Sequence, residues 1–376
     1  MGTDAALANE AHALLRSRFV DDDKTTLQAR LEAQQLAFGP MLFQAARVLR
    51  ESGALEHLNR CGKQGATPEE VAEKVAGVSL YAARVLLEAG LAAGMLVLAD
   101  GRFCITKVGY LVLRDPMTRV NFDFVHDVCY QGMFRLEESL REGRPAGLEV
   151  FGTWPTIYEG LAQLPPHVKR SWFAFDHFYS DGVFESVLPI VFESRPARIL
   201  DVGGNTGKFS LQCCAFDPEV RVTIVDHPGQ LAAARENLRA HGVDERVDGH
   251  ALDLLDPSAA LPAGYDVYWM SQFLDCFSEP EIVSILERTA AAMRPSSRLF
   301  ILETFWDRQR YEAGRFSVIT TSLYFAAMAN GNSKMYHSER MQACLAEAGL
   351  RVARIHDEIG VSHTLLCCEL ALPEEA

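Results

Sequence analysis

The sequence lacks most of the patterns that mark a metal centre, a phosphate site or a membrane segment. Its nine cysteines include no Cys-x-x-Cys pair and no His/Cys cluster with zinc-like spacing, so no metal site is predicted. The glycine-rich turn near residue 203 carries neither Gly-x-Gly-x-x-Gly nor Gly-Lys-Ser/Thr, which excludes the usual dinucleotide and nucleoside triphosphate fingerprints there. No apolar run approaches the length of a membrane span.

Positive charge is also scarce. The chain has 36 Lys and Arg against 50 Asp and Glu, a net charge of −14, which disfavours a broad surface for nucleic acid or anionic membranes. The first fifteen residues lack the basic start and apolar block of a signal peptide, and the scattered cysteines suit buried apolar positions in a reducing compartment. We therefore expect a cytoplasmic protein that binds small molecules or another protein, with no nucleic-acid or membrane partner.

The most informative stretch is Ala-Arg-Ile-Leu-Asp-Val-Gly-Gly-Asn-Thr-Gly at residues 197–207. Its apolar residues predict a short buried strand, and residues 208–215 continue with the spacing of a helix. The turn between them is rich in residues that tolerate positive φ and allow close approach of a ligand: Gly203, Gly204, Asn205 and Gly207. The same glycines would also serve a tight turn that binds nothing.

Two acidic residues favour the binding interpretation. Asp201, near the end of the first strand, can hold an ammonium group, and Asp226 ends a second predicted strand at 220–225. A carboxylate in the latter position can accept hydrogen bonds from ribose hydroxyls. Together they predict an adenosyl ligand that carries an amino acid.

The N-terminal third predicts helices followed by a winged helix. Residues 30–58 carry an apolar stripe at helical spacing that would seek a partner, and Thr67 caps a helix at 68–75. A second helix at 80–89 precedes a β pair at 95–98 and 103–106. DNA binding is one interpretation of such a motif, but the second helix offers one cation, Arg84, so a dimerisation and substrate-covering domain is favoured.

Beyond the glycine turn, predicted strands and helices alternate, which is typical of a doubly wound parallel α/β sheet. The predicted elements are strands at 220–226, 248–252, 265–271 and 298–305, helices at 229–241 and 279–293, and a final hairpin at 350–359 and 364–372 that adds an antiparallel edge. Residues 120–179 form aromatic-rich helices before the sheet. Their rings could wall a pocket for a flat substrate or simply pack in the core.

Several separated motifs resemble one family, the S-adenosylmethionine-dependent O-methyltransferases of the plant caffeate and bacterial small-molecule (acetylserotonin O-methyltransferase-like) type. Residues 200–207 are similar to its LVDVGGGTG, Asp226-His227-Pro228 to its Asp-Leu-Pro, residues 139–146 to its linker, and 346–350 to its late AGF signature. The resemblance implies a Rossmann-like class I methyltransferase fold with an N-terminal helical and winged-helix dimerisation domain. It places the domains at 1–118, 119–194 (linker and substrate-pocket segment) and 195–376, and implies a homodimer.

The resemblance also implies a cofactor and its contacts. S-adenosylmethionine would be bound, with S-adenosylhomocysteine as product. The implied cofactor-binding residues are Asp201, Gly203, Gly204, Asn205, Gly207, Asp226, Asp253, Leu254 and Gln272. The residues expected to line the substrate pocket are Phe175, Tyr179, His126, Trp306 and Met328.

The catalytic positions depart from the family pattern. Where the family has Leu-His-Asp-Trp, this chain has Leu274-Asp275-Cys276-Phe277, so Asp275 replaces the general-base histidine. Glu303 retains one partner glutamate, while the second falls near Met335. If Asp275 and Glu303 lie close together, each raises the proton affinity of the other, which would give a usable base. Alternatively, Asp275 only caps the helix that starts near Ser278.

The predicted function is methyl transfer to a hydroxyl of a small aromatic, phenolic molecule in secondary metabolism. Two alternatives stay open within the same fold: C- or N-methylation of an aromatic ring, and a cofactor-binding relative that no longer transfers methyl groups, whether decarboxylase-like, hydroxylase-like or regulatory. The substrate itself is not predicted, because the side-chain directions of the pocket helices do not follow from the sequence.

Overall fold

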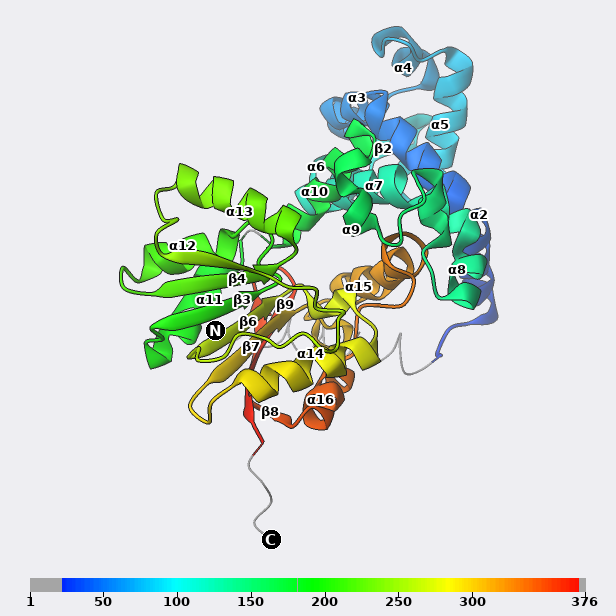
Figure 1. Ribbon diagram of the computed structural model, residues 1–376. Coiled ribbons are helices and arrows are strands. Elements are labelled where there is room, and N and C mark those ends of the chain that lie inside the picture. The colour runs from blue at the N-terminus through cyan, green and yellow to red at the C-terminus, as the bar shows by residue number, and fades with distance from the viewer. Residues whose placement is uncertain (1–21, 181, 372–376) are drawn as a thin grey trace, which may run out of the picture. The chain divides into compact units, whose positions relative to one another are not determined.

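The computed structural model describes residues 22–180 and 182–371. They divide into two compact units, an N-terminal unit up to Asp127 and a C-terminal unit from Val128 onward (Figure 1). The three-part division predicted from the sequence, with boundaries after 118 and 194, stays a prediction. No helix in the described part of the chain is long and apolar enough to cross a membrane, and the cytoplasmic location also stays a prediction.

The N-terminal unit is mainly helical and contains the predicted winged helix. Its elements are α2 (Thr26–Glu51), α3 (Ala54–Cys61), α4 (Pro68–Lys74), α5 (Leu80–Ala92), β1 (Leu96–Ala99), β2 (Arg102–Ile105), α6 (Lys107–Arg114) and α7 (Pro116–Phe124). Thr67 caps α4 through a capping box with Glu70. The antiparallel pair β1 and β2 turns at Asp100 and Gly101, both at positive φ. The two helices and the wing were therefore predicted correctly.

The C-terminal unit is built on one seven-stranded sheet. The strands are β3 (Arg198–Val202), β4 (Arg221–Asp226), β5 (Val247–Ala251), β6 (Val267–Ser271), β7 (Arg298–Glu303), β8 (Leu350–Ile359) and β9 (His363–Leu370). Their order is β5-β4-β3-β6-β7-β9-β8. The first five are parallel, and β9 runs antiparallel to both β7 and β8. The predicted doubly wound sheet and its antiparallel edge hairpin are confirmed.

Helices cover both faces of this sheet, because the strands are apolar on both sides. The helices of this unit are α8 (Leu136–Glu142), α9 (Ile157–Gly160), α10 (Pro166–Ser180), α11 (Phe184–Val191), α12 (Lys208–Phe216), α13 (Pro228–Ala240), α14 (Glu279–Ala292), α15 (Glu312–Tyr324) and α16 (Ser338–Glu347). Figure 1 shows α13 on one side of the sheet and α14 and α16 on the other.

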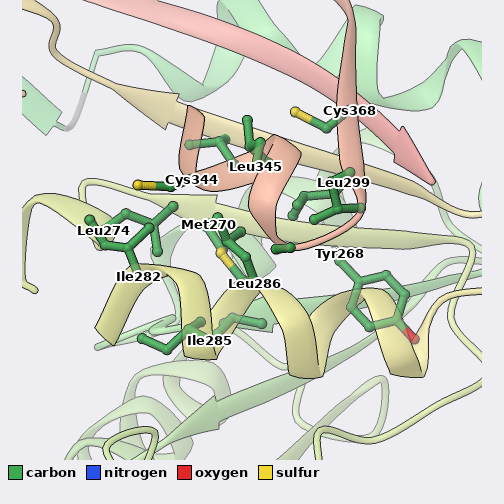
Figure 2. Close-up of a cluster of buried hydrophobic side chains, with 14 of the residues drawn as sticks. Tyr268, Met270, Leu274, Ile282, Ile285, Leu286, Leu299, Cys344, Leu345 and Cys368 are labelled. Atoms are coloured by element: carbon green, nitrogen blue, oxygen red, sulfur yellow. The ribbon is translucent and has the colours of Figure 1, made fainter. Parts of the chain in front are cut away.

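Alternate strand residues point into two separate cores. Tyr268 and Met270 of β6 face α14 and α16, where Ile282, Leu286 and Leu345 complete one cluster (Figure 2). The neighbouring β6 residues, Val267 and Trp269, belong to the opposite cluster with α11, α12 and α13. This two-sided burial holds the sheet rigid, so the loops at the carboxyl ends of its strands have a fixed base.

The cysteines contribute to these cores as apolar side chains. All nine lie in the described part of the chain and are free thiols, and six of them are buried. Cys213 and Cys214 belong to the cluster around α12, and Cys344 and Cys368 to the cluster around α16. Cys276 is one of the three half-buried cysteines, and it differs from the others because it lies beside Asp275 at the end of the sheet.

Candidate active site

The candidate site lies where the winding of the sheet reverses. The chain passes from β3 outward to β4 and β5, and then returns to β6 on the other side of β3. In doubly wound sheets the crevice at the carboxyl ends of such a strand pair is the usual ligand position. Gly203 follows β3 and Gln272 follows β6, so the predicted cofactor residues flank this point.

The glycine turn after β3 has the expected backbone, with one correction. Gly203, Asn205 and Gly207 have φ of 73°, 50° and 76°, in the left-handed region. Gly204 was expected to share this conformation, but its φ is not positive. It is required for a different reason: a Cβ there would lie 2.8 Å from the Asp201 carboxyl group. A Cβ on Gly203 would likewise lie 2.4 Å from the Phe273 ring.

Asp201 is enclosed beneath this turn. Its side chain is 2% exposed, and its Oδ2 accepts a hydrogen bond from the Ser210 hydroxyl at 2.7 Å. Burial raises the pKa of Asp201 to about 7, although the Ser210 hydrogen bond acts in the opposite direction. The structure thus gives Asp201 a fixed place against α12 and Gly204. Its predicted contact with the methionine end of the cofactor stays a prediction.

Asp226 ties the second strand to the turn. Its Oδ2 accepts from the Asn205 backbone N–H at 2.9 Å, and its Oδ1 accepts from the His227 N–H at 2.7 Å. Burial raises the pKa of Asp226, and the two backbone donors oppose that shift. Each carboxylate oxygen can accept more than one hydrogen bond. Asp226 can therefore hold the turn and still accept donors such as ribose hydroxyls.

The remaining predicted cofactor residues lie at the neighbouring strand ends. Asp253 is exposed just after β5 and accepts from the Leu255 N–H at 2.9 Å. Leu254 is buried in the core next to α14, and Gln272 takes a positive φ of 47° immediately after β6. Ser271, the last residue of β6, has a buried hydroxyl with no hydrogen-bond partner among the described residues, so a ligand there would find an available donor.

Asp275 and Glu303 come together at the end of β6 and β7. Asp275 lies in the single turn Leu274–Cys276, called η7, and Glu303 ends β7. Glu303 is 2% exposed, and its Oε1 accepts from the backbone N–H groups of Phe273 and Leu274 at 2.9 and 2.8 Å. Its Oε2 is buried and has no partner among the described residues. The helix α14 is capped by Ser278, so the alternative that Asp275 is the cap is wrong.

The surroundings of the pair favour one shared negative charge. Burial raises the pKa of Asp275 to about 6, and the nearby carboxylate of Asp176 also raises it. Burial and the charge of Asp275 raise the pKa of Glu303 well above its usual range. Of the two carboxyl groups, Glu303 has the more strongly raised pKa, so Asp275 is the one that ionises first. A carboxylate with a pKa near 6 is suited to general-base catalysis, whereas an exposed aspartate is too weak a base.

Three further side chains hold the η7 turn. The Asn330 amide donates to the Cys276 carbonyl at 2.6 Å, and the Tyr336 hydroxyl donates to the Phe277 carbonyl at 2.6 Å. The Tyr158 hydroxyl lies 3.1 Å from the Cys276 sulfur. These contacts do not follow from the sequence, because the three residues come from segments 54 to 118 positions away from the turn.

Helix α10 links the acid pair with the glycine turn. Trp172 donates its indole N–H to the Tyr324 hydroxyl at 2.8 Å, and Asp176, one turn later, raises the pKa of Asp275. The next residue, His177, has its Nδ1 2.8 Å from the Nζ of Lys208, the first residue of α12. The same helix therefore contacts both ends of the candidate site.

The predicted pocket residues are only partly brought together. Phe175 and Tyr179 lie on α10 with their ring centroids 5.1 Å apart. Trp306 follows β7 and packs edge-on against His337, whereas Met328 is fully buried against Gly132. His126 belongs to the N-terminal unit, where its Nδ1 lies 3.3 Å from the Gln44 amide. All five assignments stay predictions.

Comparisons with known proteins agree with this geometry. Residues 30–103 match a family model described as a Dimerisation2-like domain, and residues 180–351 match one described as an O-methyltransferase domain. Residues 180–351 therefore form an O-methyltransferase domain, and a Dimerisation2-like domain precedes it. Residues 30–103 of this methyltransferase cover the winged helix, and residues 180–351 run from just before α11 into the start of β8.

Individual relatives of this methyltransferase span most of the chain. An L-tyrosine C(3)-methyltransferase of Streptomyces lavendulae is 24% identical over 331 residues, which is 86% of this chain and 88% of the relative. A 3-hydroxy-5-methyl-1-naphthoate 3-O-methyltransferase of Streptomyces sahachiroi is 29% identical over 276 residues, 72% of this chain and 76% of the relative. The crystal structure of the methyltransferase SibL in its apo form covers 90% of this chain and 98% of its own, with 24% identity and a TM-score of 0.67.

The site of this methyltransferase fits its family's cofactor. The glycine turn has backbone in the left-handed region, Asp226 has acceptor capacity left for hydroxyl groups, and the Ser271 hydroxyl is unpaired among the described residues. The adenosyl ligand inferred from the two strand-end acids is S-adenosylmethionine. Within residues 22–180 and 182–371, no group of three or more His, Cys, Asp or Glu side chains could hold a metal ion.

Proposed function

We propose that this methyltransferase transfers a methyl group to a hydroxyl of a small phenolic molecule in secondary metabolism, with Asp275 as the general base. The observation that carries the proposal is the buried pair of Asp275 and Glu303. In the alignment with the family pattern, Asp275 takes the position of the histidine base and Glu303 that of one partner glutamate. Two relatives whose names describe 3-O- and 4-O-methylation of hydroxylated aromatic acids support the substrate class.

When bound, S-adenosylmethionine supplies an electrophilic methyl group and leaves as S-adenosylhomocysteine. The residues proposed to hold it are those at the β3, β4, β5 and β6 ends: Asp201, Gly203, Gly204, Asn205, Gly207, Asp226, Asp253, Leu254 and Gln272. The protein's own task is then to orient the acceptor and to take its proton.

Asp275 is the group that takes this proton. A phenol with a pKa of about 10 is mostly un-ionised at neutral pH, and its hydroxyl is a weak nucleophile until the proton leaves. As the acceptor oxygen forms its bond to the methyl group, its hydroxyl proton moves to the Asp275 carboxylate. Glu303, fixed by two backbone N–H groups, has the more strongly raised pKa of the pair, so Asp275 is the carboxyl that ionises first and accepts the proton.

An acceptor screen tests this function. Purified protein is incubated with S-adenosylmethionine and a panel of hydroxybenzoates, hydroxynaphthoates and catechols, and the release of S-adenosylhomocysteine and the mass of the product are measured. At least one phenol should gain a single methyl group. Asp275→Asn should abolish that reaction, whereas Asp244→Asn, which changes an exposed aspartate near Arg239, should not. A panel without any methylated product, despite cofactor binding, would contradict the proposal.

Methylation at a ring carbon is a second candidate. The L-tyrosine C(3)-methyltransferase relative, which matches 86% of this chain, favours it. Asp275 would also serve as the base for C-methylation, because removal of a phenolic proton activates the neighbouring ring carbon. The position of the methyl group in the product, determined by NMR, decides between the two reactions.

The protein is also proposed to be a homodimer through its N-terminal unit. Helix α2 exposes apolar side chains at helical spacing, Leu27, Leu31, Phe38 and Met41, within or next to the residues that match the Dimerisation2-like domain. An apolar stripe of this size is typical of a protein interface. Light scattering should give twice the mass of 41.7 kDa, and a Leu31→Lys/Met41→Lys variant should give a monomer. A monomeric wild-type protein would contradict this arrangement.

A further inference from the structure

The η7 turn contains a short chain of hydrogen bonds that ends on Asp275. The Tyr158 hydroxyl, on the four-residue helix α9, lies 3.1 Å from the Cys276 sulfur. The Cys276 thiol in turn donates to Oδ1 of Asp275 at 3.5 Å, a normal length for a hydrogen bond that involves sulfur. Tyr158 therefore reaches the proposed base through one intervening thiol.

The direction of this chain follows from the protons that are present. Burial raises the pKa of the Cys276 thiol well above its usual range, so the sulfur carries one hydrogen. If that hydrogen points to Asp275, the sulfur has only lone pairs to offer Tyr158, and Tyr158 must be the donor. The phenolic hydrogen of Tyr158 then has the Cys276 sulfur as its acceptor, and the thiol hydrogen of Cys276 has the Asp275 carboxylate.

The opposite direction leaves one group unsatisfied. If Asp275 were protonated and donated to the sulfur, the thiol hydrogen would point to the Tyr158 oxygen. The phenolic hydrogen of Tyr158 would then need another acceptor, and Cys276 is its one hydrogen-bond partner in the described part of the chain. Because a buried donor without a partner is unfavourable, the favoured direction runs from Tyr158 to Asp275. The thiol hydrogen bond to Oδ1 of Asp275 is stronger when that carboxyl is ionised than when it is neutral.

We propose that Tyr158 is a positioning residue for Asp275 and acts through the Cys276 thiol to keep that carboxylate oriented and ionised for proton removal. This inference rests on the proposed function of Asp275 as the base. Neither Tyr158 nor Cys276 is assigned a contact with the reacting atoms.

The other titratable groups around Asp275 act against ionisation or are neutral. Asp176 on α10 raises its pKa, and burial has the largest effect in the same direction. Burial and the charge of Asp275 raise the pKa of Glu303 on β7, and Tyr336, whose own pKa is raised by burial, is a neutral phenol. Among the side-chain groups that act on the Asp275 carboxyl, the Cys276 hydrogen bond is the one that lowers its pKa, so its loss should be measurable.

The test follows the titration of Asp275 directly. Aspartate labelled at the side-chain carboxyl carbon is incorporated, and the Asp275 signal is identified by its absence in Asp275→Asn. The pH at the midpoint of the Asp275 titration is then measured by NMR. Cys276→Ala should raise the midpoint by about half a pH unit to one unit, the size expected for one hydrogen bond to a carboxylate. Cys276→Ser, which retains a donor, should stay near the wild-type midpoint.

Tyr158→Phe separates a positioning role from packing. It should raise the midpoint in the same direction as Cys276→Ala, and the double variant should shift no further than Cys276→Ala alone, because Tyr158 acts only through the thiol. An unchanged midpoint in Tyr158→Phe, or additive shifts in the double variant, would overturn the inference. If Cys276→Ala does not fold, the titration midpoints of Tyr158→Phe and Cys276→Ser still show whether Tyr158 acts on Asp275.

This titration needs neither an acceptor nor turnover. If Asp275→Asn kept full activity, the base function would fail, while the midpoints would still show whether Tyr158 controls the protonation of Asp275. If the midpoints do not move but Asp275→Asn is inactive, the base function stands and this inference fails.

Discussion

Two pairs of acids lie at neighbouring strand ends of the same sheet, and they are held by different sets of donors. At the β3 and β4 ends, Asp226 has a backbone N–H on each oxygen, and Asp201 has the Ser210 hydroxyl. At the β6 and β7 ends, one oxygen of Glu303 is buried without a partner, and the hydrogen bond to the Asp275 side chain comes from a thiol, a weak donor.

This difference separates binding from proton transfer. A carboxylate such as Asp226, fixed by one donor on each oxygen and with further acceptor capacity, is a rigid acceptor that suits recognition of hydroxyl groups. A carboxylate pair in a buried place has a high proton affinity when desolvation outweighs its hydrogen bonds, as it does for Glu303 despite its two backbone donors. The first pair should therefore determine cofactor affinity, and the second should determine the rate of methyl transfer.

The largest effect is expected from Asp275→Asn. The amide has nearly the same shape but cannot accept a proton, so turnover should fall by about a hundredfold or more, the usual contribution of a general base. The dissociation constant for S-adenosylmethionine, measured by calorimetry, should stay at the wild-type value. A large loss of cofactor affinity in this variant would mean that the two pairs do not have separate roles.

The converse effect is expected at the first pair. Asp226→Ala removes the acceptor of the Asn205 and His227 N–H groups, so the turn loses its anchor and a ribose its partner. Cofactor affinity should fall by roughly tenfold to a hundredfold, which corresponds to one or two hydrogen bonds to a charged group. At saturating cofactor, turnover should recover most of the wild-type rate. A failure to recover would contradict the separation of cofactor binding from methyl transfer between the two pairs.

The pH dependence sharpens the comparison. Because Asp275 works as the ionised form and its pKa is raised to about 6, kcat/KM should increase with pH up to about 6 and then level off. Asp176→Asn removes a negative charge that raises this pKa, so the rising limb should move to lower pH. A limb that stays in place, or moves to higher pH, would show that Asp176 does not act on the base.

The smallest effect concerns stability at the first pair. Burial raises the pKa of Asp201 to about 7 in the folded protein, compared with about 4 in the unfolded chain. The contribution of Asp201 to folding stability is therefore complete below about pH 4 and is lost as the pH rises through about 7. Asp201→Asn carries no charge and should gain stability relative to wild type on the order of 1 kcal/mol between pH 5 and 8. Urea unfolding measures it, with Asp244→Asn as the control that should show no such gain.

The first pair could be predicted from the sequence and the second only in part. Asp201 and Asp226 each lie in or at the end of an apolar strand, so the periodicity alone places them at the carboxyl edge. Asp275 and Glu303 were found by their alignment with the family pattern, but their burial was not predictable. The residues that contact the η7 turn or act on the Asp275 pKa lie in other segments of the chain: Tyr158, Asp176, Asn330 and Tyr336.

The errors have local physical causes. Gly204 was expected to be needed for positive φ, because glycine in a turn usually is, but the close Asp201 carboxyl is the reason. The chain from Tyr158 to Asp275 could not be inferred because α9 has only four residues, without a helical pattern of its own, and Tyr158 is 118 positions from Cys276.

The most direct test of the central claim compares two acceptors in Asp275→Asn. One is the phenol that the screen identifies, and the other is its nitro-substituted analogue, which is already ionised at neutral pH and needs no base. The variant should lose about a hundredfold in methyl-transfer rate with the phenol and little with the ionised analogue. Equal losses with both acceptors would contradict the assignment of proton removal to Asp275.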